Sequence, residues 1–187
     1  MSLTVDILAR IALDAGHLIM QVYATDFNVD RKDDSSPVTE ADEKAEALIL
    51  AALAEADPDL PVIAEESVAA GNLPEHGNRF ALVDPLDGTK EFINKRGEFT
   101  VNIGIIENGV PVMGVVYAPA LSRLFVADSR FSAWQAEAAP GAAVPDPSAR
   151  TSLRIRRAPA EGLIAAMKPT RFWKPSRLGI LFLRGHH

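Results

Sequence analysis

The strongest constraint on the fold of this chain is a change in hydrophobic period near residue 58. Before this point, apolar residues recur at helical spacing over residues 5–22 and again over residues 45–53. After it, apolar residues come in short runs bounded by turn-forming residues, a pattern typical of strands. Two helices followed by such runs predict an α+β protein that layers helices on a mostly antiparallel sheet, without strict βαβ alternation.

Local signals set the expected bounds of these elements. Thr39 and, three residues later, Asp42 resemble a capping box that opens the second helix. This helix should end near Asp57, because a residue that precedes proline disfavours helical geometry. Asn108 and Gly109 predict a two-residue hairpin turn, since both positions tolerate positive φ. We expect strands over residues 61–64, 80–83, 99–106, 112–117, 124–127 and 153–155.

The charges are divided unevenly along the 187 residues. Residues 1–149 carry 10 Lys and Arg against 24 Asp and Glu, whereas residues 150–187 carry 9 against 1. An acidic body is a poor electrostatic match to nucleic acid polymers and to anionic membrane surfaces. Its clustered carboxylates therefore point first to divalent cations.

Composition excludes several other classes of protein. The chain has no Cys, which rules out disulfide scaffolds, thiolate zinc sites and Cys nucleophiles. With 48% hydrophobic and 24% charged residues, it suits a globular domain rather than a disordered chain. No apolar run approaches the roughly 20 residues that a membrane span needs, and the first residues lack the pattern of a signal peptide. We therefore expect a cytoplasmic protein without a membrane span.

The sharpest motif is Asp-Pro-Leu-Asp-Gly-Thr at residues 84–89, directly after an apolar run. Asp84 would stand at a strand end, and Asp87 would return a second carboxylate to the same place. Hard cations such as Mg²⁺ prefer oxygen ligands, so two rigidly held carboxylates meet their demand. If Thr89 begins a helix, its amide and that of Gly88 would face a phosphate group.

A second pair of acids, Glu65 and Glu66, follows the apolar run at residues 62–64. Successive strand residues face opposite ways, so one acid would be a direct ligand and the other a neighbour through water or a hydrogen bond. Asp42, in the first turn of the second helix, would orient a nucleophilic water together with Thr89. Each feature alone also fits a turn, a solvated surface pair or a helix-dipole partner. Two acidic clusters at strand ends together favour function.

At these residues the sequence resembles the inositol monophosphatase superfamily of metal-dependent phosphatases, from the first helix to about Met167. The resemblance rests on Pro-Val-Thr-Glu-Ala-Asp at 37–42, Ala-Glu-Glu-Ser at 64–67 and the motif at 84–89, in this order, and on the strand pair 100–105 and 114–119. It implies a layered αβαβα sugar-phosphatase-like fold with a mostly antiparallel sheet and an incomplete second half.

Two further segments narrow the resemblance within the superfamily. Thr-Lys-Glu-Phe-Ile at 89–93 and Gly-Val-Pro-Val-Met-Gly at 109–114 look most like 3'(2'),5'-bisphosphate nucleotidases. Those enzymes remove the 3'-phosphate from adenosine 3',5'-bisphosphate in sulfur assimilation. Inositol 1-monophosphate is the nearest alternative substrate.

The resemblance also implies a role for each motif residue. It implies four ligands for Mg²⁺: Glu65, Asp84, the Leu86 carbonyl and Asp87. It implies three catalytic residues: Asp42, Thr89 and Glu65. It implies three residues that bind the small-molecule phosphate ester: Gly88, Thr89 and Asp87. In two-metal chemistry of this kind the attack is an in-line displacement by water, and no phosphorylated protein intermediate is needed.

The likeness ends in the C-terminal part of the chain. Family members are longer and carry a Trp-Asp motif whose Asp is a further metal ligand, whereas here Gln135 follows Trp134 and Lys174 follows Trp173. We interpret the chain as C-terminally truncated. It would consist of a metal-binding α+β domain at 1–135, an Ala/Pro-rich loop at 136–152, and an incomplete second domain with an atypical basic tail at 153–187. Truncation would leave part of the sheet or its helices unburied, which favours a homodimer.

Two other functions compete with this interpretation. A haloacid dehalogenase type phosphatase carries a similar Asp-x-Asp-Gly-Thr signature, but its two Asp residues are two positions apart, and Asp84 and Asp87 are three apart. A metal- or phosphate-binding remnant without turnover gains weight from the missing Trp-Asp motif, because the loss of one metal ligand can cost more rate than binding.

Overall fold

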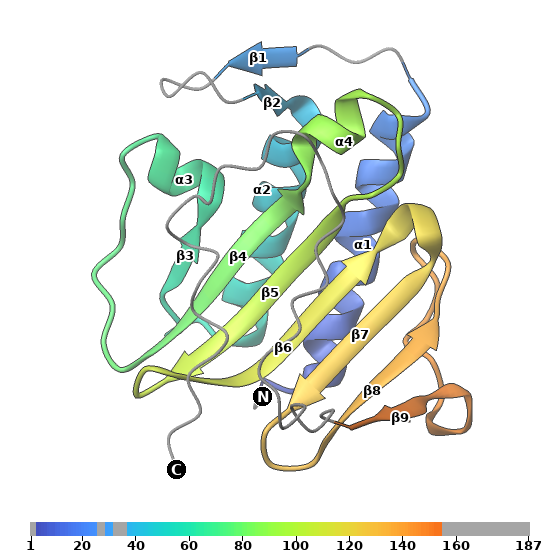
Figure 1. Cartoon of the computed structure of the whole chain (residues 1–187). Helices are drawn as coiled ribbons and strands as arrows, with labels where there is room; N and C mark the ends of the chain where they lie inside the picture. Colours follow the sequence, from blue (N-terminus) through green and yellow to red (C-terminus); the bar gives the residue numbers. More distant parts are fainter. Residues whose placement is uncertain (1–2, 26–28, 32–36, 155–187) are drawn as a thin grey trace, which may run out of the picture. The chain divides into compact units, whose positions relative to one another are not determined.

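Two long helices lie side by side on one face of a seven-stranded sheet (Figure 1). A computed structural model describes residues 3–25, 29–31 and 37–154 of the chain. The helices are α1 (Val5–Tyr23) and α2 (Glu40–Ala56). Contacts divide the chain into residues 1–154 and 155–187, and the second unit lies outside the described residues.

The sheet is almost entirely antiparallel. Its strands, in spatial order, are β3 (Val62–Ala64), β4 (Arg79–Asp87), β5 (Thr100–Glu107), β6 (Val110–Ala118), β7 (Arg123–Asp128), β8 (Ser132–Glu137) and β9 (Thr151–Leu153). Only the pair of β3 and β4 is parallel among these strands. The α+β class with a mostly antiparallel sheet, as predicted, is therefore confirmed.

Shorter elements complete the described chain. Two strands, β1 (Val29–Arg31) and β2 (Pro37–Thr39), form a separate antiparallel ribbon. The helices α3 (Glu65–Ala69) and α4 (Thr89–Ile93) follow β3 and β4 directly. Single 3₁₀ turns, η1 (Pro119–Leu121) and η2 (Pro147–Ala149), follow β6 and precede β9. Within the described residues, no helix is long and apolar enough to cross a membrane.

The hydrophobic core lies between the two long helices and the sheet. The apolar stripe of α1 is fully buried at Leu8, Ala12 and Ile19, and its spacing of three to four residues is the one predicted from the sequence. Gly16 allows α1 to approach β6, since a Cβ atom at this position would lie 2.3 Å from the Tyr117 ring. The long helix α1 and the central strands are thus closely packed against each other.

The second helix begins and ends as the sequence predicts. The Asp42 carboxylate accepts hydrogen bonds from the Thr39 amide at 2.8 Å and the Thr39 hydroxyl at 2.6 Å, and the Thr39 hydroxyl accepts one from the Ala41 amide at 3.2 Å. This is the expected capping box. The helix ends at Ala56, with Asp57 as its cap. The hairpin turn is also confirmed, because Asn108 and Gly109 both have positive φ.

The predicted strands are confirmed with shifted ends, and three of the described strands were missed: β1, β2 and β8. β4 continues from Val83 to Asp87, because its pairing with β5 resumes beyond a bulge. β8 was not expected, and its first residues pair with β7 across a tight turn. The last strand covers 151–153 rather than 153–155, and residue 155 lies outside the described residues.

The predicted division into a domain, a loop and a second domain stays a prediction. β8 ends at Glu137 and β9 begins at Thr151, so that the segment between them has the 3₁₀ turn η2 and no strand. Nearly all of the predicted second domain at 153–187, with its basic tail, lies outside the described residues.

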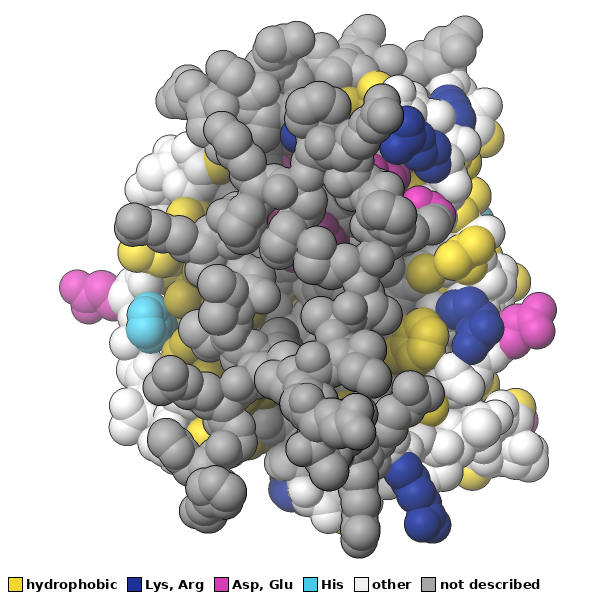
Figure 2. Space-filling view, viewed as in Figure 1, with side chains coloured by type: hydrophobic (Ala, Val, Ile, Leu, Met, Phe, Trp, Pro, Cys, Tyr) yellow, Lys and Arg dark blue, Asp and Glu magenta, His cyan; other side chains and the backbone are white. Residues whose placement is uncertain are grey.

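The visible part of the described surface mixes charged and apolar side chains (Figure 2). Hydrophobic side chains form separate patches between Lys, Arg, Asp and Glu in this view. Two of the most exposed large apolar residues, Leu73 and Phe131, lie in connecting segments rather than in strands. Scattered exposure of this kind is normal for a protein surface.

Candidate active site

The acidic motifs meet at one end of the sheet. Because β3 and β4 are parallel, their C-terminal ends lie at the same edge, where α3 and α4 begin (Figure 1). The first turn of α2 lies at this edge as well, since β2, which precedes it, contacts α4 and α2 itself contacts α3. Ligand sites in sheet proteins commonly form where strand ends and helix starts converge.

The sequence suggested that Glu65 and Glu66 continue the strand at residues 62–64, but they do not. β3 ends at Ala64, and Glu65 is the first residue of α3. Glu65 and Glu66 are therefore neighbours in a helix, and the prediction that they face opposite sides of a strand is wrong. The chain turns into a helix here because a carboxylate from α2, that of Glu46, accepts hydrogen bonds from the Glu66 and Ser67 amides at 2.7 and 2.8 Å.

A bulge near the end of β4 separates Asp84 from Asp87. Asp84 pairs with Asn102 and Asp87 pairs with Thr100, so three steps along β4 match two steps along β5. Bulges of this kind bend a strand and redirect its side chains. The side-chain amide nitrogen of Asn102 (Nδ2) donates a hydrogen bond to the Asp87 carboxylate at 3.4 Å, and the Thr100 hydroxyl donates one to the Asn102 side-chain oxygen at 3.1 Å.

Gly88 connects β4 to α4 in a conformation that favours glycine. Its φ is 98°, in the left-handed region, and a Cβ atom here would lie 2.9 Å from the Glu98 carbonyl oxygen. Thr89 then begins α4, which confirms the predicted helix start. The helix is anchored by Phe92, whose ring centroid lies 5.1 Å from that of Tyr23 and 5.2 Å from that of Phe99.

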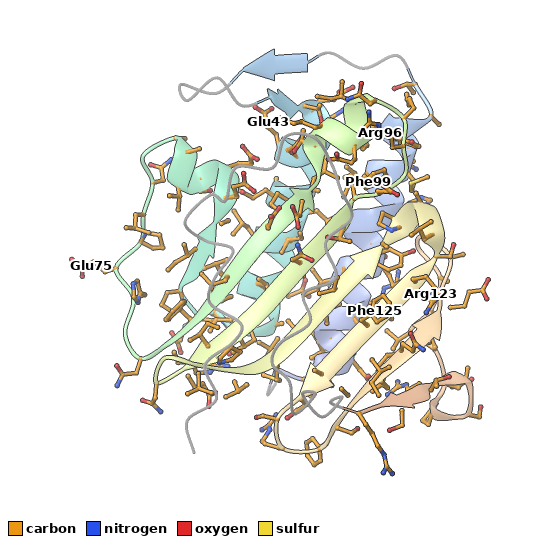
Figure 3. The ribbon with its side chains drawn as sticks, viewed as in Figure 1. Glu43, Glu75, Arg96, Phe99, Arg123 and Phe125 are labelled. Carbon is orange, nitrogen blue, oxygen red and sulfur yellow. The ribbon has the colours of Figure 1, made fainter. Side chains whose placement is uncertain are left out.

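The anchoring rings lie directly below the short helix. Phe92 and Phe99 are fully buried, and Phe99 lies 5.1 Å from Tyr23 between ring centroids. Figure 3 shows Phe99 at the upper end of the sheet, below α4. The cluster of Tyr23, Phe92 and Phe99 therefore fixes the position of α4 relative to the sheet, and with it the position of the Thr89 hydroxyl.

Asp42 and Thr89 are in direct contact. The Thr89 hydroxyl lies 3.1 Å from a carboxylate oxygen of Asp42 and 3.2 Å from the Leu86 carbonyl oxygen, and it can donate to either. The Leu86 amide in turn donates to the Asp84 carboxylate at 3.2 Å. One chain of hydrogen bonds therefore links α2, α4 and the end of β4.

Burial and like charge raise the pKa values of these acids. Desolvation, followed by the repulsion of Glu65 and Asp87, raises the pKa of Asp84 to about 8, and a side-chain hydrogen bond with Glu65 adds to this. Desolvation raises the pKa of Asp87, and the charges of Glu65 and Glu91 act in the same direction. Desolvation also raises the pKa of Asp42, which is 1% exposed, against hydrogen bonds from the Thr39 hydroxyl and amide, the Thr89 hydroxyl and the amide of Asp42 itself, which lower it.

The chemistry of these residues fits a hard divalent cation. Glu65, Asp84 and Asp87 supply carboxylate oxygens, and the Leu86 carbonyl oxygen has a second lone pair beside the one that Thr89 uses. The mutual repulsion of the three acids is the electrostatic setting that a cation relieves. In the described part of the chain, no three acidic or histidine side chains are already arranged around one point. The assignment of these residues as ligands therefore stays a prediction.

Sequence reasoning missed two polar residues of this region. Asn102 faces Asp87 only because of the β4 and β5 register, which no local pattern shows. Glu46 had a signal that was not used, because it lies one helical turn after Asp42 on the buried side of α2. A charged residue on a buried stripe needs a partner.

A cavity of about 400 Å³ lies elsewhere, between the start of α1 and strands β8 and β9. Its Arg150 guanidinium stacks over Trp134 at 4.3 Å, pairs with Asp6 at 3.1 Å and donates to the Pro145 carbonyl at 2.9 Å. These contacts join α1 to the sheet edge. The Arg150 guanidinium covers one face of the Trp134 ring, which is buried.

The sequence matches a known family over most of its length. Residues 2–159 match the inositol monophosphatase family. The 3'(2'),5'-bisphosphate nucleotidase CysQ of Salmonella typhimurium is 51% identical over 130 residues, which are 68% of this chain and 52% of that protein. CysQ of Escherichia coli K12 is 46% identical over 134 residues, or 71% of this chain and 54% of that protein. This chain thus spans about half the length of the curated relatives it matches.

Solved structures agree with this assignment. CysQ from Bacteroides thetaiotaomicron has a TM-score of 0.61 at 34% identity, and the match covers 82% of this chain and 59% of that one. The inositol monophosphatase of Thermotoga maritima has a TM-score of 0.63 at 31% identity, over 70% and 50% of the two chains. The chain therefore belongs to the inositol monophosphatase family. Its expected likeness to 3'(2'),5'-bisphosphate nucleotidases is also confirmed, and the haloacid dehalogenase interpretation is set aside.

Proposed function

We propose that this chain is a Mg²⁺-dependent phosphomonoesterase that removes the 3'-phosphate of adenosine 3',5'-bisphosphate. The single observation that carries the proposal is the contact between the Thr89 hydroxyl and the Asp42 carboxylate, 3.1 Å apart, beside the acids of β4. A buried carboxylate that holds a hydroxyl is an arrangement for orienting water. The likeness to proteins named 3'(2'),5'-bisphosphate nucleotidase supports the substrate.

In this proposal the ion is held by Glu65, Asp84, Asp87 and the Leu86 carbonyl. When bound, such an ion polarises phosphoryl oxygens and lowers the pKa of water. Desolvation, together with the repulsion of Glu65 and Asp87, raises the pKa of Asp84 to about 8. A bound cation would relieve this repulsion, which supports the assignment. A cytoplasmic location and a part in sulfur assimilation stay predictions.

The Thr89 hydroxyl has a defined part in the proposed reaction. When it donates its proton to Asp42, the lone pairs of its oxygen remain able to accept a hydrogen bond from water. Asp42 is held by the Thr39 amide and hydroxyl, so that its carboxylate keeps one orientation. The pair would thus orient a water molecule for attack on the phosphorus.

The amides of Gly88 and Thr89 are the proposed contacts of the substrate phosphate. They stand at the start of α4, where backbone N–H groups have no partner inside the helix. The first intrahelical hydrogen bond of α4 is made by the Phe92 amide to the Gly88 carbonyl, at 2.9 Å. Asp87, the residue before Gly88, is the third proposed contact of the substrate.

A paired assay on the whole 187-residue chain tests the proposal. Calorimetry measures Mg²⁺ binding, and phosphate release is measured from adenosine 3',5'-bisphosphate and, in parallel, from inositol 1-phosphate. We expect binding and faster release from the nucleotide. Faster release from inositol 1-phosphate would overturn the proposed substrate. Mg²⁺ binding without phosphate release would favour a metal-binding remnant without turnover.

Two variants sharpen this assay. Asp84→Asn removes a proposed ligand and should abolish both Mg²⁺ binding and release. Glu75→Gln makes the corresponding change from acid to amide in the segment between α3 and β4. The Glu75 side chain is exposed and points away from the sheet in Figure 3, so this variant should leave Mg²⁺ binding and phosphate release unchanged. Equal behaviour of the two variants would contradict the proposed metal site.

A further inference from the structure

One buried carboxylate near the site has no part in the proposed chemistry. Glu46 is 4% exposed and lies one turn after Asp42 on α2. Its carboxylate accepts three hydrogen bonds: from the Glu66 amide at 2.7 Å, from the Ser67 amide at 2.8 Å and from the Ser67 hydroxyl at 2.5 Å. Burying a charge is costly unless such donors compensate it.

These hydrogen bonds replace a cap that the local sequence does not supply. α3 is preceded by Ala64, which makes no side-chain capping bond. Glu46, about 20 positions earlier in the chain, provides the missing acceptor for two amides in the first turn of α3. The direction in which α3 leaves the sheet therefore depends on a residue of α2.

The helix that carries Glu46 is itself fixed in the core. Ala45, Ile49 and Leu53 of α2 are fully buried, and α2 contacts β4 directly. A carboxylate on such a helix cannot follow a movement of α3, so it holds the first turn of α3 at a set position relative to β4. The first residue of that turn is Glu65.

We propose that Glu46 is a positioning residue: by binding the Glu66 and Ser67 amides, it keeps the Glu65 carboxylate against Asp84 and so sets the affinity of the metal site. This inference rests on the proposed function, because it concerns a ligand of the proposed Mg²⁺ site. Residues that orient metal ligands commonly change metal affinity by about 10–100-fold when they are replaced.

Two sets of variants test this role. Glu46→Gln keeps the size of the side chain but removes one acceptor oxygen and the charge. Ser67→Ala removes one of the three hydrogen bonds, whereas Ser67→Thr keeps the hydroxyl and is the conservative rescue. Glu43→Gln is the matched control, because Glu43 is an exposed residue in the first turn of the same helix (Figure 3). Ile49→Val controls for a loss of core packing on that helix.

Two measurements separate positioning from a structural role. Hydrogen exchange of the Glu66 and Ser67 amides is measured in the metal-free chain, and Mn²⁺ affinity is measured by calorimetry. We expect Glu46→Gln to speed exchange at both amides and to weaken Mn²⁺ binding by at least about tenfold. Ser67→Ala should show an intermediate loss, Ser67→Thr should match the wild type, and both control variants should bind Mn²⁺ as the wild type does.

The outcomes are distinguishable. If the wild type binds Mn²⁺ and Glu46→Gln binds it equally well, the inference about Glu46 is overturned and the proposed metal site stands. If the wild type does not bind Mn²⁺, the proposed function fails, and the inference fails with it. If Glu46→Gln does not fold, Ser67→Ala decides, because unchanged Mn²⁺ affinity and amide exchange in that variant would overturn the inference.

Discussion

The Thr89 hydroxyl lies 3.1 Å from the Asp42 carboxylate across 47 positions of the chain, and donates a hydrogen bond to it. The contact joins the first turn of α2 to the first turn of α4. Asp42 also accepts two hydrogen bonds from Thr39 at its own helix start, so that one carboxylate both caps α2 and orients Thr89. A residue at a helix N-terminus thus combines a structural and a proposed catalytic role.

Replacing Thr89 should test the proposed catalytic role and leave the Asp42 cap of α2 in place. Thr89→Val removes the hydroxyl, and we expect phosphate release to fall by about 10²–10⁴-fold, because a group that positions the attacking water is lost. Thr89→Ser keeps the hydroxyl and should retain most of the activity. The measurement is steady-state phosphate release, with urea unfolding in parallel to verify that both variants fold. Full activity of Thr89→Val would exclude a part for this hydroxyl in the reaction.

Asp84→Asn should make the metal-free chain more stable. Desolvation and the repulsion of Glu65 and Asp87 raise the pKa of Asp84 to about 8, so the charged form is unfavourable in the folded state. The substitution removes that charge, and we expect a gain of about 1–3 kcal/mol in unfolding free energy at pH 8, within the usual range for single substitutions. Guanidinium unfolding with a chelator present measures it.

The pH dependence of that gain follows from the direction of the pKa shift. Between about pH 4, the ordinary pKa of Asp, and about pH 8, the folded chain binds more protons at Asp84 than the unfolded chain does. Stability of the wild type therefore falls as pH rises through this range, relative to Asp84→Asn. The difference between the two proteins should be small at pH 4 and largest near pH 8. A difference that does not change with pH would contradict the assignment of this acid.

Gly88→Ala should cost more stability than Gly109→Ala. Both glycines have positive φ, 98° and 76°, so each alanine pays a backbone penalty of about 1–2 kcal/mol. At Gly88 the new Cβ would also lie 2.9 Å from the Glu98 carbonyl oxygen, whereas nothing lies within 4 Å at Gly109. Thermal unfolding of the two variants compares them directly. Equal losses would show that the turn before α4 can relax.

Asp128→Asn should destabilise the chain at neutral pH and have no effect in acid. The Asp128 carboxylate accepts hydrogen bonds from the Arg130 amide at 2.8 Å and from its guanidinium at 3.1 and 2.9 Å, and these side-chain bonds lower the pKa of Asp128. A lowered pKa means that the stabilisation is present above about pH 4 and is lost as pH falls through the folded-state pKa. Denaturant midpoints from pH 2 to pH 7 measure the crossover, and a constant difference would contradict it.

Elements with a strong local signal could be predicted from the sequence. The apolar period of residues 5–22, the Thr39 and Asp42 capping box and the Asn108 and Gly109 turn each depend on residues close in the chain, and each is confirmed. β8 was missed because its sequence, Ser-Ala-Trp-Gln-Ala-Glu, has small and polar residues on one side and becomes a strand through its pairing with β7. Tertiary pairing outweighs weak strand propensity in this case.

In the candidate site, too, features that depend on neighbouring residues could be predicted, and features that depend on distant residues could not. Asp84, Asp87, Gly88 and Thr89 stand within one turn, so their common location could be predicted from the motif. The helix start at Glu65 could not, because it depends on a carboxylate from α2 rather than on a neighbouring cap. The metal-binding and catalytic roles of these residues stay predictions for the experiments above.

The spacing of Asp42 and Glu46 has a consequence for engineering this scaffold. Four residues of an α-helix span about 6 Å along its axis, and both carboxylates point to the same side. Inserting a single residue between them would rotate one carboxylate by about 100° relative to the other, so that only one of the two short helices could keep its hydrogen bonds to α2. Insertions, permuted termini or fused domains therefore belong outside residues 39–67, in segments that carry no link between α2 and the short helices.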